Sequence, residues 1–236
     1  MDAYGLAPDM LIVLDRSLSM LQGLRWDPSK QAVKTITSEF EGLIAFGLEY
    51  FPGGDLNDIG GLLGAGNLGG LLGGAGTAGA ADLGGLLGGG ATAGAGNFGG
   101  LFGGGTAGGA ALACGGAEKI DVPLMRKNAG PIATSVDATF PNGFTPTGPA
   151  LTVALQALGD RRLQLDQAVK PAYVLLVTDG DPRCGVADDP AQQESARAAV
   201  KALKSANIPT YVFGYQIDAA YQPLMNELAM LGGTQR

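Results

Sequence analysis

Hydrophobic residues gather into short runs along the chain, and these runs alternate with longer stretches that carry apolar residues on one helical face. The runs of strand length are 10–14, 43–51, 119–124, 172–178 and 210–215. Helices are expected from Asp27, over 126–138, from Pro149, from Asp189 and through Leu224 and Leu228. Alternation of strands and helices is typical of α/β proteins whose parallel-rich sheet is covered by helices on both faces.

Two of the predicted helices begin with the same dipeptide. Asp27 and Asp189 are each followed by proline, and aspartate is a favoured N-cap while proline suits the first helical turn. In these two helices, and in the one expected from Pro149, apolar residues recur at helical spacing, which places them on one face of each helix. These residues are Ala32, Val33, Ile36 and Phe40, then Leu151, Leu155 and Leu158, and finally Val200 and Leu203.

Residues 53–116 interrupt this pattern. The stretch holds 28 of the 41 glycines and no Lys or Arg, and a unit such as "DLGGLLG" recurs in it. Copies from Asn67, Asp82 and Asn97 are 15 residues apart, so this is an internal repeat. Glycine at this density disfavours a packed core, which predicts a flexible insertion. Its Leu and Phe pairs leave self-association or surface attachment open as an alternative to a plain linker.

Charge and composition exclude several classes of function. The chain has 15 Lys and Arg against 22 Asp and Glu, so a surface that tracks nucleic-acid phosphates is not expected. Histidine is absent, which removes the commonest general base and transition-metal ligand. Any bound metal is therefore expected to have oxygen ligands. No run reaches the roughly 18–20 apolar residues of a transmembrane span.

The cysteines and the start of the chain bear on location. Cys114 and Cys184 are too few and too far apart for a zinc site, which leaves two free thiols or one disulfide. The opening "MDAYGLAPD" has no basic start and no long apolar core, so it does not match a secretory signal. Either the protein stays in the cytoplasm, or this sequence begins downstream of its true start.

Polar residues follow two of the predicted strands where each ends. The first strand leads into Asp15, with Ser17 and Ser19 at alternate positions, and Asp179 follows the most apolar strand. Ligands of such sheets bind outside the carboxyl ends of the strands, and Thr145, which precedes a helix, is expected to bring a third hydroxyl there. Hydroxyl and carboxylate oxygens suit a hard cation such as Mg²⁺, so these residues predict a magnesium-type site.

Three segments resemble the von Willebrand factor A domain family. "DRSLS" matches its D-x-S-x-S signature, "GFTPTGPAL" is similar to its threonine loop, and "VLLVTDG" looks like its strand with the second acid. The segments occur in the order found in that family. With the alternation of strands and helices they cover nearly all of 9–236 outside the 53–116 insertion. The resemblance implies a doubly wound, mostly parallel sheet with one antiparallel edge strand, and the chain stops before the last strand expected of the family.

The resemblance also implies a metal-ion-dependent adhesion site. In that site Ser17 and Ser19 would bind Mg²⁺ directly, with Mn²⁺ or Ca²⁺ as alternatives, and Thr145 would do so in the ligand-bound state. Asp15 and Asp179 would act largely through water. A protein partner would complete the coordination with an Asp or Glu carboxylate, which makes the chain a binding or adhesion module rather than an enzyme.

Location and disulfide bonding follow from the same resemblance. A parallel second strand would bring the insertion, and Cys114 at its far end, to the edge where Cys184 lies, which favours a Cys114–Cys184 disulfide. A disulfide implies export, and bacterial A-domain proteins of similar layout, with a cysteine shortly after "TDG", are typically exported. We therefore expect an extracellular, cell-surface or periplasmic protein. Two unpaired thiols and a cytoplasmic location remain the alternatives.

Competing interpretations apply to the site as well. Serine and threonine often cap helices, and aspartate before glycine often forms a turn. These ordinary roles are open to Ser17, Ser19, Thr145, Thr147 and Asp179. They do not explain why all the polar ends share one edge. Asp181 is interpreted as a rim charge that deters acidic ligands.

Two other functions remain open. A phosphoryl-transfer hydrolase of the haloacid dehalogenase type would also place an acid after its first strand, but it needs a second acid at the position of Ser17. No general base is evident either. Alternatively, the glycine repeats are the functional part, and the chain is a structural or self-associating protein.

Overall fold

A five-stranded sheet forms the centre of the protein in a computed structural model, which describes residues 7–53, 119–164, 170–184 and 189–235. The strand order is β3-β2-β1-β4-β5. The strands are β1 (Asp9–Asp15), β2 (Ala45–Phe51), β3 (Ile120–Met125), β4 (Ala172–Thr178) and β5 (Thr210–Gly214). All five lie within the runs expected from the sequence or extend past them by one residue at an end, and β1 does so at both ends.

The sheet is parallel except at one edge. β1 pairs in parallel with β2 and β4, and β4 pairs in parallel with β5. β3 is antiparallel to β2. The expected doubly wound α/β fold, with a mostly parallel sheet and one antiparallel edge strand, is therefore confirmed. β2 is parallel to β1 as expected, and it ends at Phe51, opposite Asp15.

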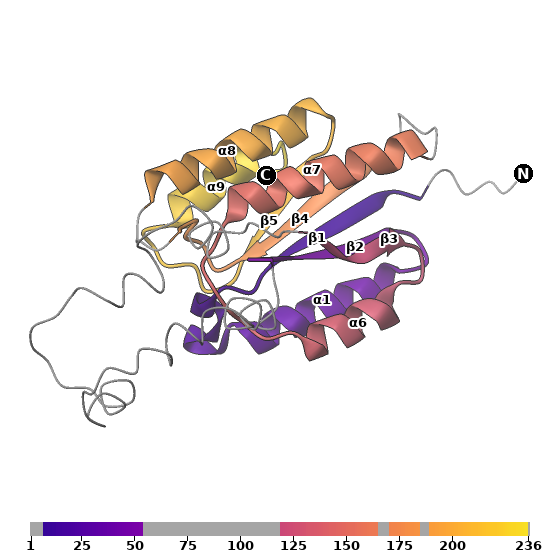
Figure 1. The fold of residues 1–236 in the computed structure, drawn as a ribbon, viewed down its shortest axis with the longest axis horizontal. Coiled ribbons are helices and arrows are strands. Elements are labelled where there is room, and N and C mark those ends of the chain that lie inside the picture. The colour runs from indigo at the N-terminus through magenta and orange to yellow at the C-terminus, as the bar shows by residue number, and fades with distance from the viewer. Residues whose placement is uncertain (1–6, 54–118, 165–169, 185–188, 236) are drawn as a thin grey trace, which may run out of the picture.

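Helices cover both faces of the sheet (Figure 1). α1 and α6 lie on one face, and α7, α8 and α9 lie on the other. A 3₁₀ segment, η1 (Leu18–Leu24), follows β1. The helices are α1 (Trp26–Phe40), α6 (Ala129–Ala138), α7 (Thr147–Gln164), α8 (Pro190–Ser205) and α9 (Gln222–Leu231). No helix within the described segments is long and apolar enough to span a membrane.

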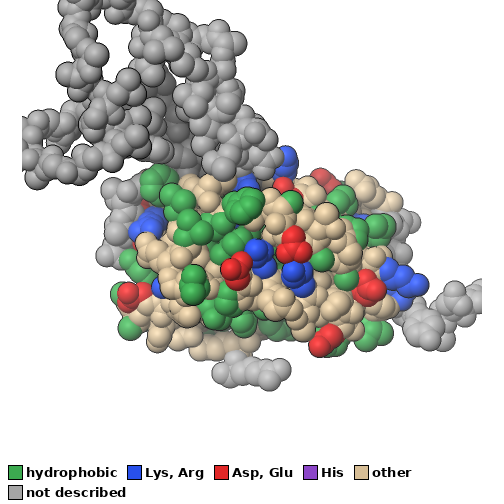
Figure 2. Space-filling view, turned by 90° about the horizontal axis from the view of Figure 1, so that it is seen from below, with side chains coloured by type: hydrophobic (Ala, Val, Ile, Leu, Met, Phe, Trp, Pro, Cys, Tyr) green, Lys and Arg blue, Asp and Glu red, His purple; other side chains and the backbone are tan. Residues whose placement is uncertain are grey.

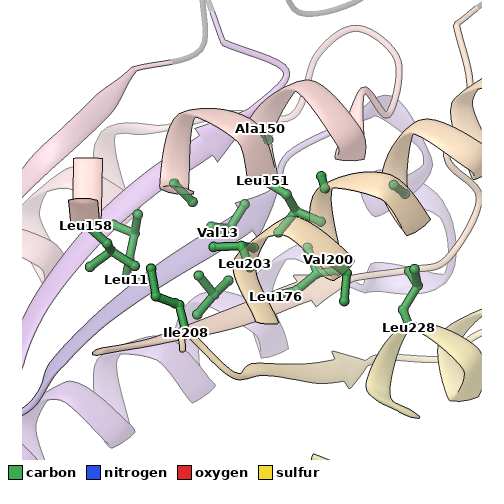
Figure 3. Packing of buried hydrophobic residues seen from close by; sticks show 14 of the residues in the cluster. Leu11, Val13, Ala150, Leu151, Leu158, Leu176, Val200, Leu203, Ile208 and Leu228 are labelled. Atoms are coloured by element: carbon green, nitrogen blue, oxygen red, sulfur yellow. The ribbon is translucent and has the colours of Figure 1, made fainter. Parts of the chain in front are cut away.

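Alternate residues of β1 serve the two halves of the core. Leu11 and Val13 pack with residues of α7, α8 and α9 (Figure 3), whereas Ile12 and Leu14 pack with residues of α1 and α6. All four side chains are fully buried. A central strand that is covered on both faces needs apolar residues at successive positions, which explains why the run before Asp15 does not alternate with polar residues.

The predicted start of α1 is wrong, and its predicted apolar face is only partly right, since Val33 is buried and Ile36 half-buried. The helix begins at Trp26, with Arg25 as its N-cap, so Asp27 lies in the first turn and does not cap it. Ala32 and Phe40 are exposed. The buried residues are Trp26, Ser29, Val33 and Thr37. Trp26 packs in the same cluster as Val33, and burying this large side chain rotates the helix away from the expected face.

Two other helix starts also differ from expectation. α7 begins at Thr147, two residues before Pro149, and α6 begins at Ala129 rather than at 126. Proline within the first turn is compatible with a helix because the first backbone N–H groups have no partner inside the helix. The start of α8 is confirmed, since the Asp189 carboxylate accepts hydrogen bonds from the backbone N–H groups of Ala191 and Gln192 at 3.1 and 3.2 Å.

Charged residues pair on the face that carries α1 and α6. Figure 2, seen from that side, shows Lys or Arg next to Asp or Glu near the middle of the face. Lys34 of α1 donates a hydrogen bond to Asp137 of α6 at 2.8 Å. The side chains of Lys34 and Asp137 are 29% and 57% exposed, and ion pairs that reach solvent in this way contribute little to stability.

Gly148 sets how closely α7 approaches α8. A Cβ at Gly148 would overlap the Ser195 hydroxyl and lie 2.7 Å from its backbone carbonyl carbon. Gly148→Ala is therefore expected to lower the free energy of unfolding by about 1–3 kcal/mol through overpacking. Urea unfolding measures this change.

Gly159 of the same helix is the matched control. Nothing lies within 4 Å of a Cβ placed there. Gly159→Ala should leave stability unchanged or raise it by up to about 1 kcal/mol, because alanine has the higher helix propensity. If the two substitutions change the free energy of unfolding equally, the close contact between α7 and α8 does not explain the effect at Gly148.

Candidate functional site

The predicted polar residues collect at one edge of the sheet, on the left in Figure 1. β1 ends at Asp15, β4 ends at Thr178 just before Asp179, and these strands are parallel neighbours. Their carboxyl ends therefore meet at the same edge, which is where α/β sheets bind ligands.

Asp15 is held rigidly at the end of β1. The side chain is fully buried. One carboxylate oxygen, Oδ1, accepts a hydrogen bond from the backbone N–H of Ser17 at 2.8 Å. The other, Oδ2, accepts one from the Thr178 hydroxyl at 2.6 Å. Thr178 in turn accepts a bond from the N–H of Gly180 at 3.2 Å, so Asp15 links the ends of both central strands.

The two serines connect to the second acid. The Ser17 and Ser19 hydroxyl oxygens are 2.9 Å apart, and Ser19 donates a hydrogen bond to Asp179 Oδ1 at 3.0 Å. Ser17 is the N-cap residue of η1, but its side chain makes no capping hydrogen bond, so capping does not account for its hydroxyl. Four of the five predicted residues, Asp15, Ser17, Ser19 and Asp179, thus lie in one connected cluster.

Thr145 lies on the neighbouring loop. Its backbone exchanges hydrogen bonds with Arg183 at 3.0 and 3.1 Å, and its side chain is buried. The loop is held against the start of η1, because the N–H of Leu18 donates to the carbonyl of Gly143 at 3.1 Å. In the part of the chain that the structure describes, the Thr145 hydroxyl makes no hydrogen bond to the other four predicted residues. Thr145 therefore shares the edge but not the hydrogen-bond network.

Gly143 allows that loop to approach β2. Its φ of +65° falls in the left-handed region, and a Cβ there would lie 2.7 Å from Pro52 Cγ. Both features favour glycine over any residue with a side chain. The glycine of "NGFTPTGPAL" thus has a structural reason of its own, independent of the ligand chemistry.

Arg25 was not expected at the site from the sequence. Its guanidinium Nη1 donates to Asp179 Oδ2 at 2.8 Å. Asp179 therefore accepts one bond from Ser19 and one from Arg25, on different oxygens. The side chain of Asp179 is 3% exposed, against 20% for Arg25. This ion pair closes the network on the side of η1.

The electrostatics of Asp15 differ from those of an exposed aspartate. Burial, followed by the nearby negative charge of Asp179, raises the pKa of Asp15 to about 7. Hydrogen bonds from Ser17 and Thr178 act in the opposite direction on this pKa. A cation close to the two carboxylates would favour the ionised form.

The interpretation of Asp181 as a rim charge is wrong. The residue is only 7% exposed, and its carboxylate lies 3.9 Å from the guanidinium of Arg183. The reason is local: Arg183 bridges to the backbone of Thr145, which folds the segment after β4 back onto the threonine loop.

The second cysteine lies next to this bridge. Cys184 follows Arg183 directly, at the edge where it was expected. Cys114 and the glycine repeats lie outside the described residues, so their expected positions and the Cys114–Cys184 pairing stay predictions.

The donor atoms at this edge fit a hard divalent cation. They are hydroxyl and carboxylate oxygens, with no nitrogen or sulfur among them. Within the described segments no group of three or more His, Cys, Asp or Glu side chains is placed to hold a metal. Mg²⁺ accepts few protein oxygens and retains water, so two carboxylates and neutral hydroxyls suit it.

The protein is thus an α/β domain with a cluster of oxygen donors at the carboxyl edge of a parallel sheet. No protein-family model matches the sequence, and no curated protein matches it. Solved structures do match. The pilus adhesin SpaC from Lactobacillus rhamnosus GG, in an open conformation, aligns with a TM-score of 0.56 and 14% identity. The alignment covers 97% of this chain but only 27% of the SpaC chain.

Two further structures give the same result. The von Willebrand factor domain of the type V pili tip protein Mfa5 from Porphyromonas gingivalis has a TM-score of 0.53 and 9% identity, covering 98% of this chain and 88% of that one. The PilB minor pilin from Streptococcus sanguinis has a TM-score of 0.55 and 12% identity, with 98% and 56% covered. At such identities the similarity extends to the fold, which is like that of von Willebrand factor domains.

Proposed function

We propose that the protein is a metal-dependent binding or adhesion module that recognises an Asp or Glu carboxylate of a protein partner through Mg²⁺. The observation that carries this proposal is the connected set of Ser17, Ser19 and Asp179 oxygens beside the buried Asp15. Mn²⁺ or Ca²⁺ are alternative ions, since both accept oxygen ligands.

The side chains divide into two roles in this proposal. Ser17 and Ser19 bind the ion directly, Thr145 joins them when the partner is bound, and Asp15 and Asp179 act mainly through water. When bound, the ion supplies a Lewis-acid position that an anionic side chain of the partner completes. The fixed hydrogen bonds of Asp15 to Ser17 and Thr178 keep the loop after β1 in place for this purpose.

A binding role fits the geometry better than catalysis does. A nucleophilic aspartate needs a free carboxylate oxygen that substrate can reach. Asp15 is fully buried, and both of its oxygens accept hydrogen bonds from protein groups. Ser17 stands where a hydrolase of the haloacid dehalogenase type would carry its second acid. The site therefore favours recognition over turnover of a phosphate ester.

Adhesion at the cell surface is the role that the similar structures favour. They are described as a pilus adhesin, a pilus tip protein and a minor pilin. The chain spans about a quarter of SpaC and about half of PilB, so the functions of those whole proteins enter here only as support for the proposal. We infer an exported protein whose binding site faces outward from the cell.

An exported protein is also consistent with the proposed Cys114–Cys184 disulfide. Within the described residues no cysteine is free. We expect the intact mass to rise by about 2 Da on reduction, because breaking one S–S bond adds two hydrogens. Mass spectrometry of the unfolded, unreduced protein with a thiol label provides the check. Full labelling of both cysteines would show that the bridge does not exist.

A peptide array tests the proposed recognition directly. The full chain is applied to short peptides that carry one Asp or Glu and to matched peptides with Asn or Gln, first with MgCl₂ and then with EDTA. We expect binding only to carboxylate peptides, and only with Mg²⁺. Equal binding to the amide peptides, or binding that EDTA leaves unchanged, would contradict the proposal.

A further inference from the structure

Arg25 holds an unusual position at the candidate site. It lies between η1 and α1 and is the N-cap residue of α1. Gln22 and Gly23, just before it, have non-helical backbone angles that break η1. This kink redirects the chain ahead of Arg25. The guanidinium spans 154 residues of sequence to reach Asp179 Oδ2 at 2.8 Å.

The contacts of Arg25 are mostly electrostatic. Its Nε is buried and has no hydrogen-bond partner within the described residues. Its Nη1 pairs with a carboxylate that is 3% exposed. Removing one partner of such a shielded pair leaves an uncompensated charge, which is costly. The position of the guanidinium is therefore tied to the charge of Asp179.

A bound metal ion and the Arg25 guanidinium would compete for the negative charge of Asp179. The guanidinium of Arg25 pairs with Asp179 Oδ2, and Asp179 Oδ1 is the oxygen that Ser19 contacts. A cation bound near Ser17 and Ser19 would lie close to the positive charge of Arg25. Two positive charges a few ångströms apart repel, and partial burial strengthens this repulsion because water screens it less.

We propose that Arg25 is a built-in counter-cation of the site: it holds Asp179 in place when metal is absent, and it opposes the binding of a divalent ion. The inference rests on the proposed metal site and adds a residue that sets its affinity. Arg25 is thus a positioning residue, since it acts through Asp179 and through charge rather than by contact with the ion. Metal binding must weaken or share the Arg25–Asp179 pair, which couples the ion to the turn between η1 and α1.

The first experiment needs no metal. The full chain and the variants Arg25→Gln, Asp179→Asn and Arg25→Gln/Asp179→Asn are unfolded with urea in EDTA. Each single substitution should destabilise the protein, and the double variant should lose less than the sum of the two. Losses that simply add would show that the two residues do not interact, and would overturn the first half of the proposal.

The second experiment measures Mg²⁺ and Mn²⁺ affinity by calorimetry. Arg25→Gln should bind about tenfold more tightly than the unmodified chain, because the repulsion is removed. Arg25→Lys, which keeps the charge, should remain near the original affinity. Unchanged or weaker binding by Arg25→Gln overturns the proposed opposition to metal.

Arg197 provides a matched control. It pairs with Glu227 at 2.9 Å between α8 and α9, and its side chain is 23% exposed, close to the 20% of Arg25. Arg197→Gln removes the same charge at a distance from the site and should leave metal affinity unchanged. If it tightens binding as much as Arg25→Gln does, net charge alone is responsible and the assignment to Arg25 fails.

The outcomes separate this inference from the proposed function. Suppose that the losses of stability in EDTA are not additive but no variant binds metal. This result would contradict both the metal site and the proposed opposition to metal, and would leave Arg25 only its pairing with Asp179. Binding by Arg25→Gln alone would support the inference in its strongest form. Equal binding by all variants would keep the metal site and reject the role of Arg25.

Discussion

Replacing both Ser17 and Ser19 with alanine is expected to lower Mg²⁺ affinity by at least about 100-fold, measured by titration calorimetry. Loss of groups that only support metal ligands already lowers metal affinity by about 10–100-fold. A larger loss is expected here because these two hydroxyls are the proposed direct ligands. Their oxygens are 2.9 Å apart, and Ser19 also contacts Asp179. Unchanged affinity in the double variant would remove the proposed site.

The fold should survive this double substitution. Ser17 is buried, with 1% of its surface exposed. Removing both partners of the Ser17–Ser19 bond costs less than removing one, but Asp179 Oδ1 loses the bond donated by Ser19, so we expect a fall in stability of about 1–3 kcal/mol. Ser29→Ala is the matched control, because Ser29 is also buried and its hydroxyl has no hydrogen-bond partner within the described residues. It should leave metal affinity unchanged.

Asp9→Asn is expected to give the largest loss of stability, about 3 kcal/mol in urea unfolding. Asp9 is 1% exposed at the opposite end of β1. Its two oxygens accept hydrogen bonds from Lys170 at 2.8 Å and from Arg161 at 2.9 Å. The asparagine would leave a buried ammonium without its counter-charge, and breaking a buried pair in this way typically costs about 3–5 kcal/mol. Because Arg161 is 27% exposed, the lower end of this range applies.

Asp137→Asn separates burial from charge in this comparison. Asp137 also pairs with a lysine at 2.8 Å, but its side chain is 57% exposed. Exposed pairs contribute little, so this variant should unfold close to the unmodified protein. A similar loss in both variants would indicate that the removed charge, rather than burial, determines the effect. Asp9→Asn should leave metal affinity unchanged, since Asp9 lies at the end of β1 opposite to Asp15.

The sequence predicted the strands well because the central strands are buried on both faces. A run such as 10–14 must then be apolar throughout, and that signal is unambiguous. Helix starts were predictable only where the local capping chemistry was decisive. Asp189 caps α8 as expected, whereas the start of α1 depends on Trp26. Burial of a distant side chain is a tertiary effect that an Asp-Pro pair does not reveal.

The candidate site was partly predictable for a related reason. Parallel strands bring their carboxyl ends together, so residues just after two neighbouring strands must meet. This reasoning placed Asp15 and Asp179 at one edge, and the structure connects them through Thr178 and Ser19. It could not find Arg25, whose approach depends on the kink in η1. No periodicity or spacing marks a residue that reaches its partner through irregular backbone.

The antiparallel pairing of β2 with β3 affects how much the connection between these two strands can vary in length and sequence. β2 leaves the sheet at Phe51 and β3 returns at Ile120 opposite Glu49, so both ends of the connection lie at the same edge. Closing a longer loop between these two ends adds little free energy for each added residue. Related chains could therefore lengthen, shorten or exchange this connection during evolution without changing the strand register. The same position is a natural place to introduce a foreign peptide next to the candidate site.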